Sequence, residues 1–134
     1  MKDNTYVDFV VNDFDRYIGW HERALTNPPF QYDLVYKQVQ QHNCDNASRL
    51  INYCAANGNL LVYLKNKIPS LSLVGVETVK ELVQHPSSRT AIDLGISLEA
   101  VSSYAMTDLK KLGQFDFAVH AMRLLHFLDW KEHL

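Results

Sequence analysis

The sequence predicts an all-α protein, a small helical bundle that ends in a helix-turn-helix unit of four helices. Three observations favour this fold class. Apolar residues recur at spacings of three and four along most of the chain, as they do on the buried face of an amphipathic helix. Polar or Pro-containing stretches separate these segments at intervals that suit helices. Only one short apolar run, residues 60–64, has the length of a strand, and no second candidate strand is evident to pair with it.

Length and composition set the limits for this fold. The chain has 134 residues, 47% of them hydrophobic, which is enough for a core in one domain or two small ones. The formal net charge of -2 does not indicate a nucleic-acid binder, so phosphate contacts would need a local basic patch. The two cysteines do not make a disulfide framework, and no signal peptide or long apolar run is present. We therefore expect a cytoplasmic protein with no membrane partner.

Residues 1–68 are expected to form an N-terminal helical region that serves dimerisation, partner binding or control. A first helix of roughly twenty residues begins near Thr5 and ends before Pro28 and Pro29, because neither proline can donate a backbone hydrogen bond. Further helices are predicted from about Gln31 to Gln41, from the polar turn at 43–46 to Gly58, and over Asn59–Lys67. The last of these contains the ambiguous run 60–64.

Residues 69–134 are expected to form the helix-turn-helix domain, with Ile68-Pro69-Ser70 as its boundary. One helix spans about Leu73–Val83, and a short one follows His85-Pro86 and ends on Leu94. Four consecutive residues then have the roles of a helix-turn-helix corner: a closing leucine, a glycine with positive φ, an apolar plug and a serine cap, namely Leu94, Gly95, Ile96 and Ser97. The second helix would continue to Leu112, and a last helix is predicted over Phe117–Trp130.

The run from Leu94 to Gly113 resembles the C-terminal DNA-binding domain of LuxR/GerE-type transcription regulators. That family's pattern is Leu-Gly-Ile-Ser, then Thr-Val, then a helix that closes on Lys-Leu-Gly, and the two patterns align without a gap from Leu94 to about Leu125. The resemblance implies one complete domain over about residues 70–134. A weaker resemblance, which needs a gap after Tyr104, is to the flagellar activator subunit FlhD. Both relatives belong to bacterial gene regulation.

The resemblance implies a small transcription regulator that binds double-stranded DNA. A homodimer is expected, because one recognition helix contacts only a half-site. Hydroxyl groups on the recognition helix would bond base edges, a methionine would meet a thymine methyl, and basic residues would contact phosphates. The expected DNA-binding face comprises Ser88, Arg89, Ser102, Ser103, Met106, Thr107, Lys110 and Lys111. Residues 69–134 nevertheless contain six basic and eight acidic residues, so few cations are available to neutralise phosphates.

A second hypothesis keeps the same fold but replaces DNA with a protein partner. The chain would then be a regulator subunit, an inhibitor or a phage-encoded anti-defence factor. The face that includes Ser102, Ser103, Tyr104 and Met106 has little charge, and tyrosine and methionine are favoured in protein contacts. The tyrosines at 32, 36, 53 and 63 are interpreted as core and interface residues rather than as a base-stacking platform.

No enzymatic activity, cofactor or metal is expected. The sequence has no nucleophile motif, no phosphate-binding glycine loop and no paired-carboxylate signature. Nothing in the sequence places Asp13, Asp15 and His21 in one pocket. A metal site is not expected either: His126, Asp129 and His133 are interpreted as a solvated last helical turn, and Cys44, Cys54 and His42 lack a zinc spacing.

Overall fold

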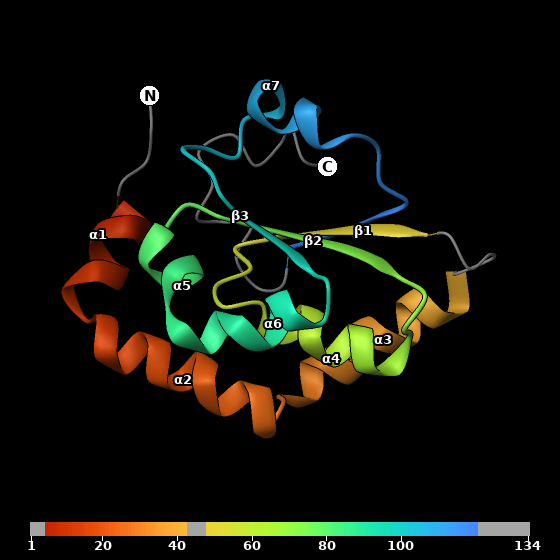
Figure 1. Cartoon of the computed structure of the whole chain (residues 1–134), viewed down its shortest axis with the longest axis horizontal. Coiled ribbons are helices and arrows are strands. Elements are labelled where there is room, and N and C mark those ends of the chain that lie inside the picture. The colour runs from red at the N-terminus through yellow and green to blue at the C-terminus, as the bar shows by residue number, and fades with distance from the viewer. Residues whose placement is uncertain (1–4, 43–47, 121–134) are drawn as a thin grey trace.

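The computed structural model describes residues 5–42 and 48–120, and these form an α/β fold (Figure 1). A four-stranded parallel sheet lies at the centre, in the order β3-β2-β1-β4. The strands are β1 (Arg49–Tyr53), β2 (Ser72–Glu77), β3 (Ser97–Ala100) and β4 (Phe117–Val119). The predicted all-α bundle is therefore wrong.

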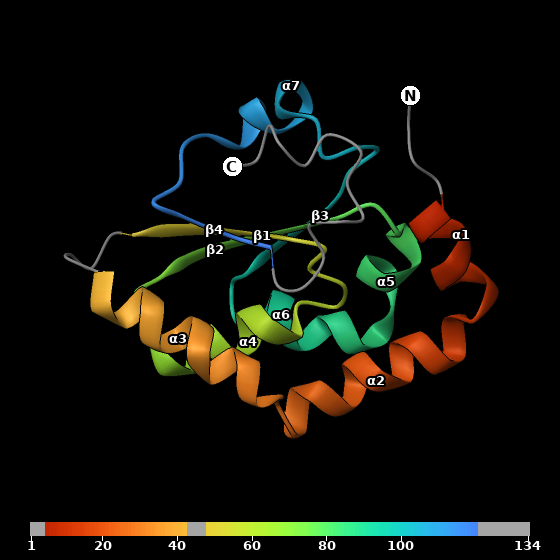
Figure 2. The same cartoon turned by 180° about the vertical axis from the view of Figure 1, so that it is seen from behind.

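Helices cover both faces of the sheet. Figures 1 and 2 show α2, α3, α4 and α6 on one side of it and α7 on the other. The helices are α1 (Thr5–Asn12), α2 (Phe14–Thr26), α3 (Phe30–His42), α4 (Asn59–Lys67), α5 (Lys80–Gln84), α6 (Arg89–Asp93) and α7 (Met106–Leu109). Two 3₁₀ turns, Pro86–Ser88 and Lys110–Leu112, lie next to α6 and α7.

Alternate residues of β1 face two separate cores. Leu50 packs with the apolar side chains of α4, whereas Ile51 and Tyr53 pack beneath Tyr104 and Leu109 on the α7 side. Because both faces are covered, β1 is buried almost throughout and its sequence shows no apolar–polar alternation. This explains why the segment does not read as a strand.

A third apolar cluster closes one end of the sheet. It joins Val10 of α1 and Ile18 of α2 to Ala56, which follows β1, and to Val79 and Leu82, which follow β2. The first two helices therefore pack against the segments that leave the carboxyl ends of β1 and β2.

Several predicted helices are replaced by strands. Over the described residues 48–58 the expected helix is β1 and a loop, and the helix expected over Leu73–Val83 is β2 followed by α5. The last helix is expected over Phe117–Trp130; residues 117–119 form β4, and residues 121–130 lie outside the described part of the chain. The helices over 31–41 and Asn59–Lys67 are confirmed as α3 and α4. The long first helix is divided at Asp13 into α1 and α2, and it ends before the two prolines as expected.

The turn predicted at residues 94–97 is confirmed, whereas the helix predicted to follow it is wrong. Gly95 has a φ of 80°, and Ile96 is buried with 4% of its surface exposed. Ser97, however, begins β3, where it pairs with Val74 of β2. The recognition helix predicted from Ser97 to Leu112 is not formed, and only its end, Met106–Leu109, is α-helical.

Candidate functional site

The residues expected to face DNA lie on opposite sides of the sheet. Thr107 on α7 and Lys110 and Lys111 on the following 3₁₀ turn are exposed on one side, and Met106 begins α7. Ser102 and Ser103 lie in the segment between β3 and α7, where Ser103 donates a hydrogen bond of 2.5 Å to Asp108. Ser88 and Arg89 lie at the beginning of α6, across the sheet. The structure therefore does not bring the eight residues together on one face.

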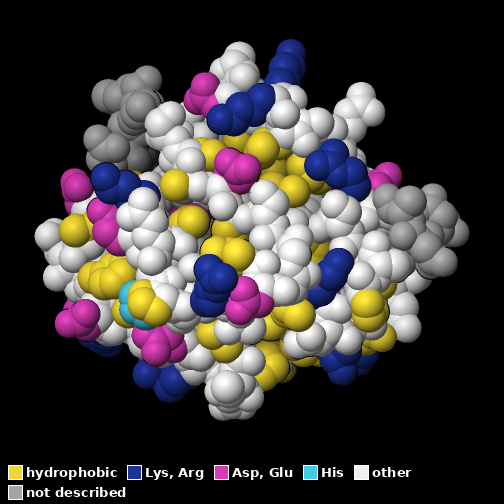
Figure 3. All heavy atoms as spheres, in the orientation of Figure 1, with side chains coloured by type: hydrophobic (Ala, Val, Ile, Leu, Met, Phe, Trp, Pro, Cys, Tyr) yellow, Lys and Arg dark blue, Asp and Glu magenta, His cyan; other side chains and the backbone are white. Residues whose placement is uncertain are grey.

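Basic side chains form no continuous stripe on the face shown in Figure 3. Lys and Arg are scattered there among Asp and Glu. Arg89 is paired with Asp93 at 3.0 Å, and Ser88 is buried with 4% of its surface exposed. A single phosphate-binding surface is not evident on this face.

The strand order indicates that a ligand site would lie at the carboxyl end of the sheet. The chain passes from β1 to β2 to β3 in one direction and then returns to place β4 on the other side of β1. In open parallel α/β sheets, ligands bind outside the carboxyl ends of the strands at such a reversal of order. The segments that meet there are the loop 54–58 after β1, Glu77–Val79 at the end of β2, and His120 after β4.

The loop after β1 has an unusual backbone. Cys54, Ala56 and Gly58 have φ angles of 56°, 53° and 84°, so alternate residues adopt the left-handed conformation although only the third is glycine. A residue with a Cβ pays roughly 1–2 kcal/mol for this conformation. Such strain persists only where the surroundings impose it, and it is concentrated at functional sites.

Glu77 is one of the groups that fix this loop. It is the last residue of β2, and none of its surface is exposed. Its Oε1 accepts a hydrogen bond from the backbone N–H of Ala56 at 3.0 Å, and its Oε2 accepts one from Val79 at 3.1 Å. The Tyr104 hydroxyl donates to Oε2 at 3.4 Å. These donors offset part of the cost of burying a carboxylate.

Three aromatic side chains form a cluster that contacts Glu77 through Tyr104. The Tyr53 ring is stacked on His120 at 4.3 Å and meets the edge of Tyr104 at 5.8 Å. Burial, followed by the nearby Glu77 carboxylate, raises the pKa of Tyr104 well above its usual value, and burial also raises the pKa of Tyr53. Both phenols therefore stay protonated near neutral pH and act as hydrogen-bond donors rather than as bases.

A buried polar network connects the beginning of α4 to α2 and α3. Asn59 accepts a hydrogen bond from the Tyr32 hydroxyl, and its amide nitrogen lies 3.0 Å from Asn57 Oδ1 and 2.7 Å from His21 Nδ1. Because that amide nitrogen is a donor, Nδ1 of His21 is the acceptor. His21 thus connects α2 to α4. Asp13 is exposed beside Arg16 and is not part of this network.

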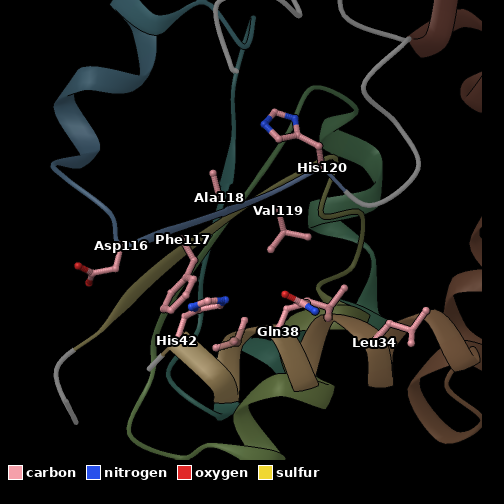
Figure 4. Close-up of a pocket in the computed structure, with 10 residues that line it drawn as sticks. Leu34, Gln38, His42, Asp116, Phe117, Ala118, Val119 and His120 are labelled. Carbon is pink, nitrogen blue, oxygen red and sulfur yellow. The ribbon is translucent and has the colours of Figure 1, made fainter. Parts of the chain in front are cut away.

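A groove lies between α3 and the outer side of β4. It has a volume of about 540 Å³, and Figure 4 shows Phe117 and Val119 pointing from β4 toward α3, with His120 at the end of the strand. Most of its wall is apolar, with Gln38, His42, Asp116 and His120 as the polar exceptions. The groove thus extends from the amino end of β4 to the reversal point.

The described residues contain no group of three His, Cys, Asp or Glu side chains placed to hold a metal ion. Within the same residues, no helix is long and apolar enough to cross a membrane. Of the residues considered for a metal site, Cys44, His126, Asp129 and His133 lie outside the described part of the chain.

Sequence reasoning missed Glu77 and His120 as site residues, and it named Tyr104 only as part of a partner-binding face. One signal was available for Glu77: it ends an apolar run and follows Gly58 by 19 residues, near the spacing of about 20 residues at which dinucleotide-binding folds carry an acidic residue. No protein-family model and no curated protein matches this chain.

Proposed function

We propose that this chain binds a nucleoside cofactor at the carboxyl end of its sheet, with Glu77 as the ribose ligand. The observation that supports this most directly is the buried Glu77 carboxylate at the end of β2, beside the loop after β1. In doubly wound folds with the order 3-2-1-4, an acidic residue in this part of the fold accepts hydrogen bonds from ribose hydroxyls. The strand order alone is an analogy of fold, so the proposal depends on Glu77.

The loop after β1 favours a nucleoside without phosphates. Dinucleotide sites use several glycines and exposed backbone N–H groups at the beginning of the next helix. Here residues 54–59 include one glycine and no Lys or Arg. The first turn of α4 is also closed, because Asn57 Oδ1 accepts from the backbone N–H of Asn59 at 3.2 Å and both residues are buried. S-adenosylmethionine is the common cofactor of this phosphate-free class.

Isothermal titration calorimetry with S-adenosylmethionine, S-adenosylhomocysteine and NAD tests the proposal. We expect binding of the two adenosyl ligands and weaker or no binding of NAD. Glu77→Gln should weaken binding by about 10- to 100-fold, because hydrogen bonds to a charged group contribute about 1.5–3 kcal/mol. Glu81→Gln, at an exposed glutamate of α5, is the matched control and should bind as the wild type does.

Competition with adenosine and 2′-deoxyadenosine tests the role of the ribose separately. Adenosine should displace the bound ligand at lower concentration, because it retains both hydroxyls for Glu77. Equal displacement by the two nucleosides, or unchanged binding by a folded Glu77→Gln protein, would overturn the assignment of Glu77. We propose that this binding takes place in the cytoplasm, because two cysteines do not make a disulfide framework of the kind that small secreted domains use.

DNA binding and protein binding stay predictions. The exposed pair Lys110 and Lys111 supports the first of them. Fluorescence anisotropy with random-sequence duplex DNA across a salt series, with a Lys110→Glu, Lys111→Glu variant alongside, tests it. Salt-sensitive binding that the variant loses would support DNA binding, whereas no binding at low salt by a folded protein would refute it.

A further inference from the structure

Glu77 already accepts a hydrogen bond from a hydroxyl of the protein itself. Resting on the proposed function, we propose that Tyr104 occupies the position of a ribose hydroxyl and thereby lowers the affinity of the site for its nucleoside. The phenol hydroxyl of Tyr104 donates to Glu77 Oε2 at 3.4 Å. A ribose hydroxyl would offer the same group to the same oxygen.

The contact between Tyr104 and Glu77 is weak enough to be replaced. Hydrogen bonds between two oxygen atoms are usually about 2.5–3.0 Å long, so 3.4 Å is a long contact. The Tyr104 hydroxyl also accepts a hydrogen bond from the backbone N–H of Thr78 at 3.1 Å, which sets its position over β2. A ligand with a hydroxyl at normal distance would therefore bond Glu77 better than Tyr104 does.

Access to Glu77 requires Tyr104 to move. None of the Glu77 surface and only 7% of the Tyr104 surface are exposed, so a ligand cannot reach the carboxylate past the closed ring. Tyr104 lies in residues 101–105, which are neither helix nor strand and connect β3 to α7. The backbone N–H of Val101 bonds the carbonyl of Glu77 at 2.9 Å, which anchors the beginning of this connection. Ligand binding would then require residues 102–105 to rearrange while β3 stays paired.

A purely structural role for Tyr104 leads to a different expectation. Its ring packs against Tyr53 in the core on the α7 side, and Tyr104→Phe preserves that ring. If the hydroxyl only stabilises the fold, removing it should leave affinity unchanged or reduce it. If the hydroxyl competes with the ligand, removing it should increase affinity.

The test is calorimetric titration of S-adenosylhomocysteine into wild type, Tyr104→Phe and Tyr63→Phe. The control is matched, because the Tyr63 hydroxyl also donates to a carboxylate, that of Asp33 at 3.2 Å, on α3. We expect Tyr104→Phe to bind roughly two- to threefold more tightly than wild type, the factor that corresponds to a hydrogen bond at the weak end of the usual range. Tyr63→Phe should bind as wild type does.

Failure of the inference can be distinguished from failure of the proposed function. Wild-type binding with equal or weaker binding by Tyr104→Phe overturns the role of Tyr104 and leaves the nucleoside site in place. No binding by any of the folded proteins overturns both. If Tyr104→Phe does not fold, 3-fluorotyrosine labelling of the wild type replaces it: the ¹⁹F resonance of Tyr104 should move when the ligand saturates the site, and an unmoved resonance overturns the inference.

Discussion

Alanine substitutions at three glycines distinguish the energetic cost of backbone strain from the cost of too little space for a side chain. At Gly58 the φ is +84° and a Cβ would lie 2.8 Å from the Cβ of Ala91. Left-handed backbone costs an alanine about 1–2 kcal/mol, and overpacking costs about 1–3 kcal/mol. Glycine's greater freedom in the unfolded chain returns about 0.4–1 kcal/mol. Gly58→Ala should therefore lower the free energy of unfolding by about 2–4 kcal/mol.

The other two glycines each test one of these effects. Gly95 has a φ of +80° but no atom within 4 Å of an added Cβ, so Gly95→Ala should cost only about 1 kcal/mol. Gly75 is in β2, and an added Cβ would lie 2.7 Å from the Cβ of Ala55. Gly75→Ala should cost about 1–2 kcal/mol from overpacking alone. Urea denaturation followed by circular dichroism measures all three. A loss at Gly58 no larger than the loss at Gly95 would show that lack of space for a side chain adds nothing at Gly58.

Two further predictions concern tyrosine hydroxyls. Tyr32→Phe leaves the buried Asn59 Oδ1 without that donor and should lower the unfolding free energy by about 1–3 kcal/mol, whereas Tyr36→Phe on the same helix should change it by less than about 0.5 kcal/mol; similar losses in urea denaturation would contradict this. At alkaline pH, burial and Glu77 keep the folded-state pKa of Tyr104 above its unfolded value of about 10. Stability from this group is therefore complete below about pH 10 and is lost as the pH rises toward the folded pKa, so Tyr104→Phe should reduce the fall in stability above about pH 10; an unchanged slope would show that the burial of Tyr104 does not set it.

Local turns could be predicted from the sequence, whereas the identity of the next element often could not. The end of α6 near Gly95 could be predicted because glycine adopts a positive φ readily. The burial of Ile96 could be predicted from its apolar side chain alone. A helix that ends on glycine can lead to a second helix or to a strand with the same local signals. Residues 97–100 are too few to distinguish the two periods. Their conformation depends on pairing with β2, and the chain itself does not show that partner.

The candidate site could not be predicted from the sequence, because its residues come together only when the strands of the sheet pair. Glu77 closes an apolar run that fits one side of a helix when taken alone, and in that interpretation it is a surface residue. Only the sheet places it beside Ala56, 21 residues away, and Tyr104, 27 residues away. Helix α4 is predicted correctly, but for a wrong reason: the prediction assumes that the sequence holds no strand that could pair with residues 60–64, whereas the structure contains a sheet of four strands.

The position of β1 between β2 and β4 has a consequence for folding. Its second edge is completed only by residues 117–119, and the contact of Arg49 with Asp116 that fixes their register spans 67 positions. Contacts this distant in sequence require a large loop to close, which slows folding. During synthesis on the ribosome, one edge of the apolar β1 therefore stays unpaired until nearly 70 further residues have been added. A chaperone that binds extended apolar segments would find its target there during that interval.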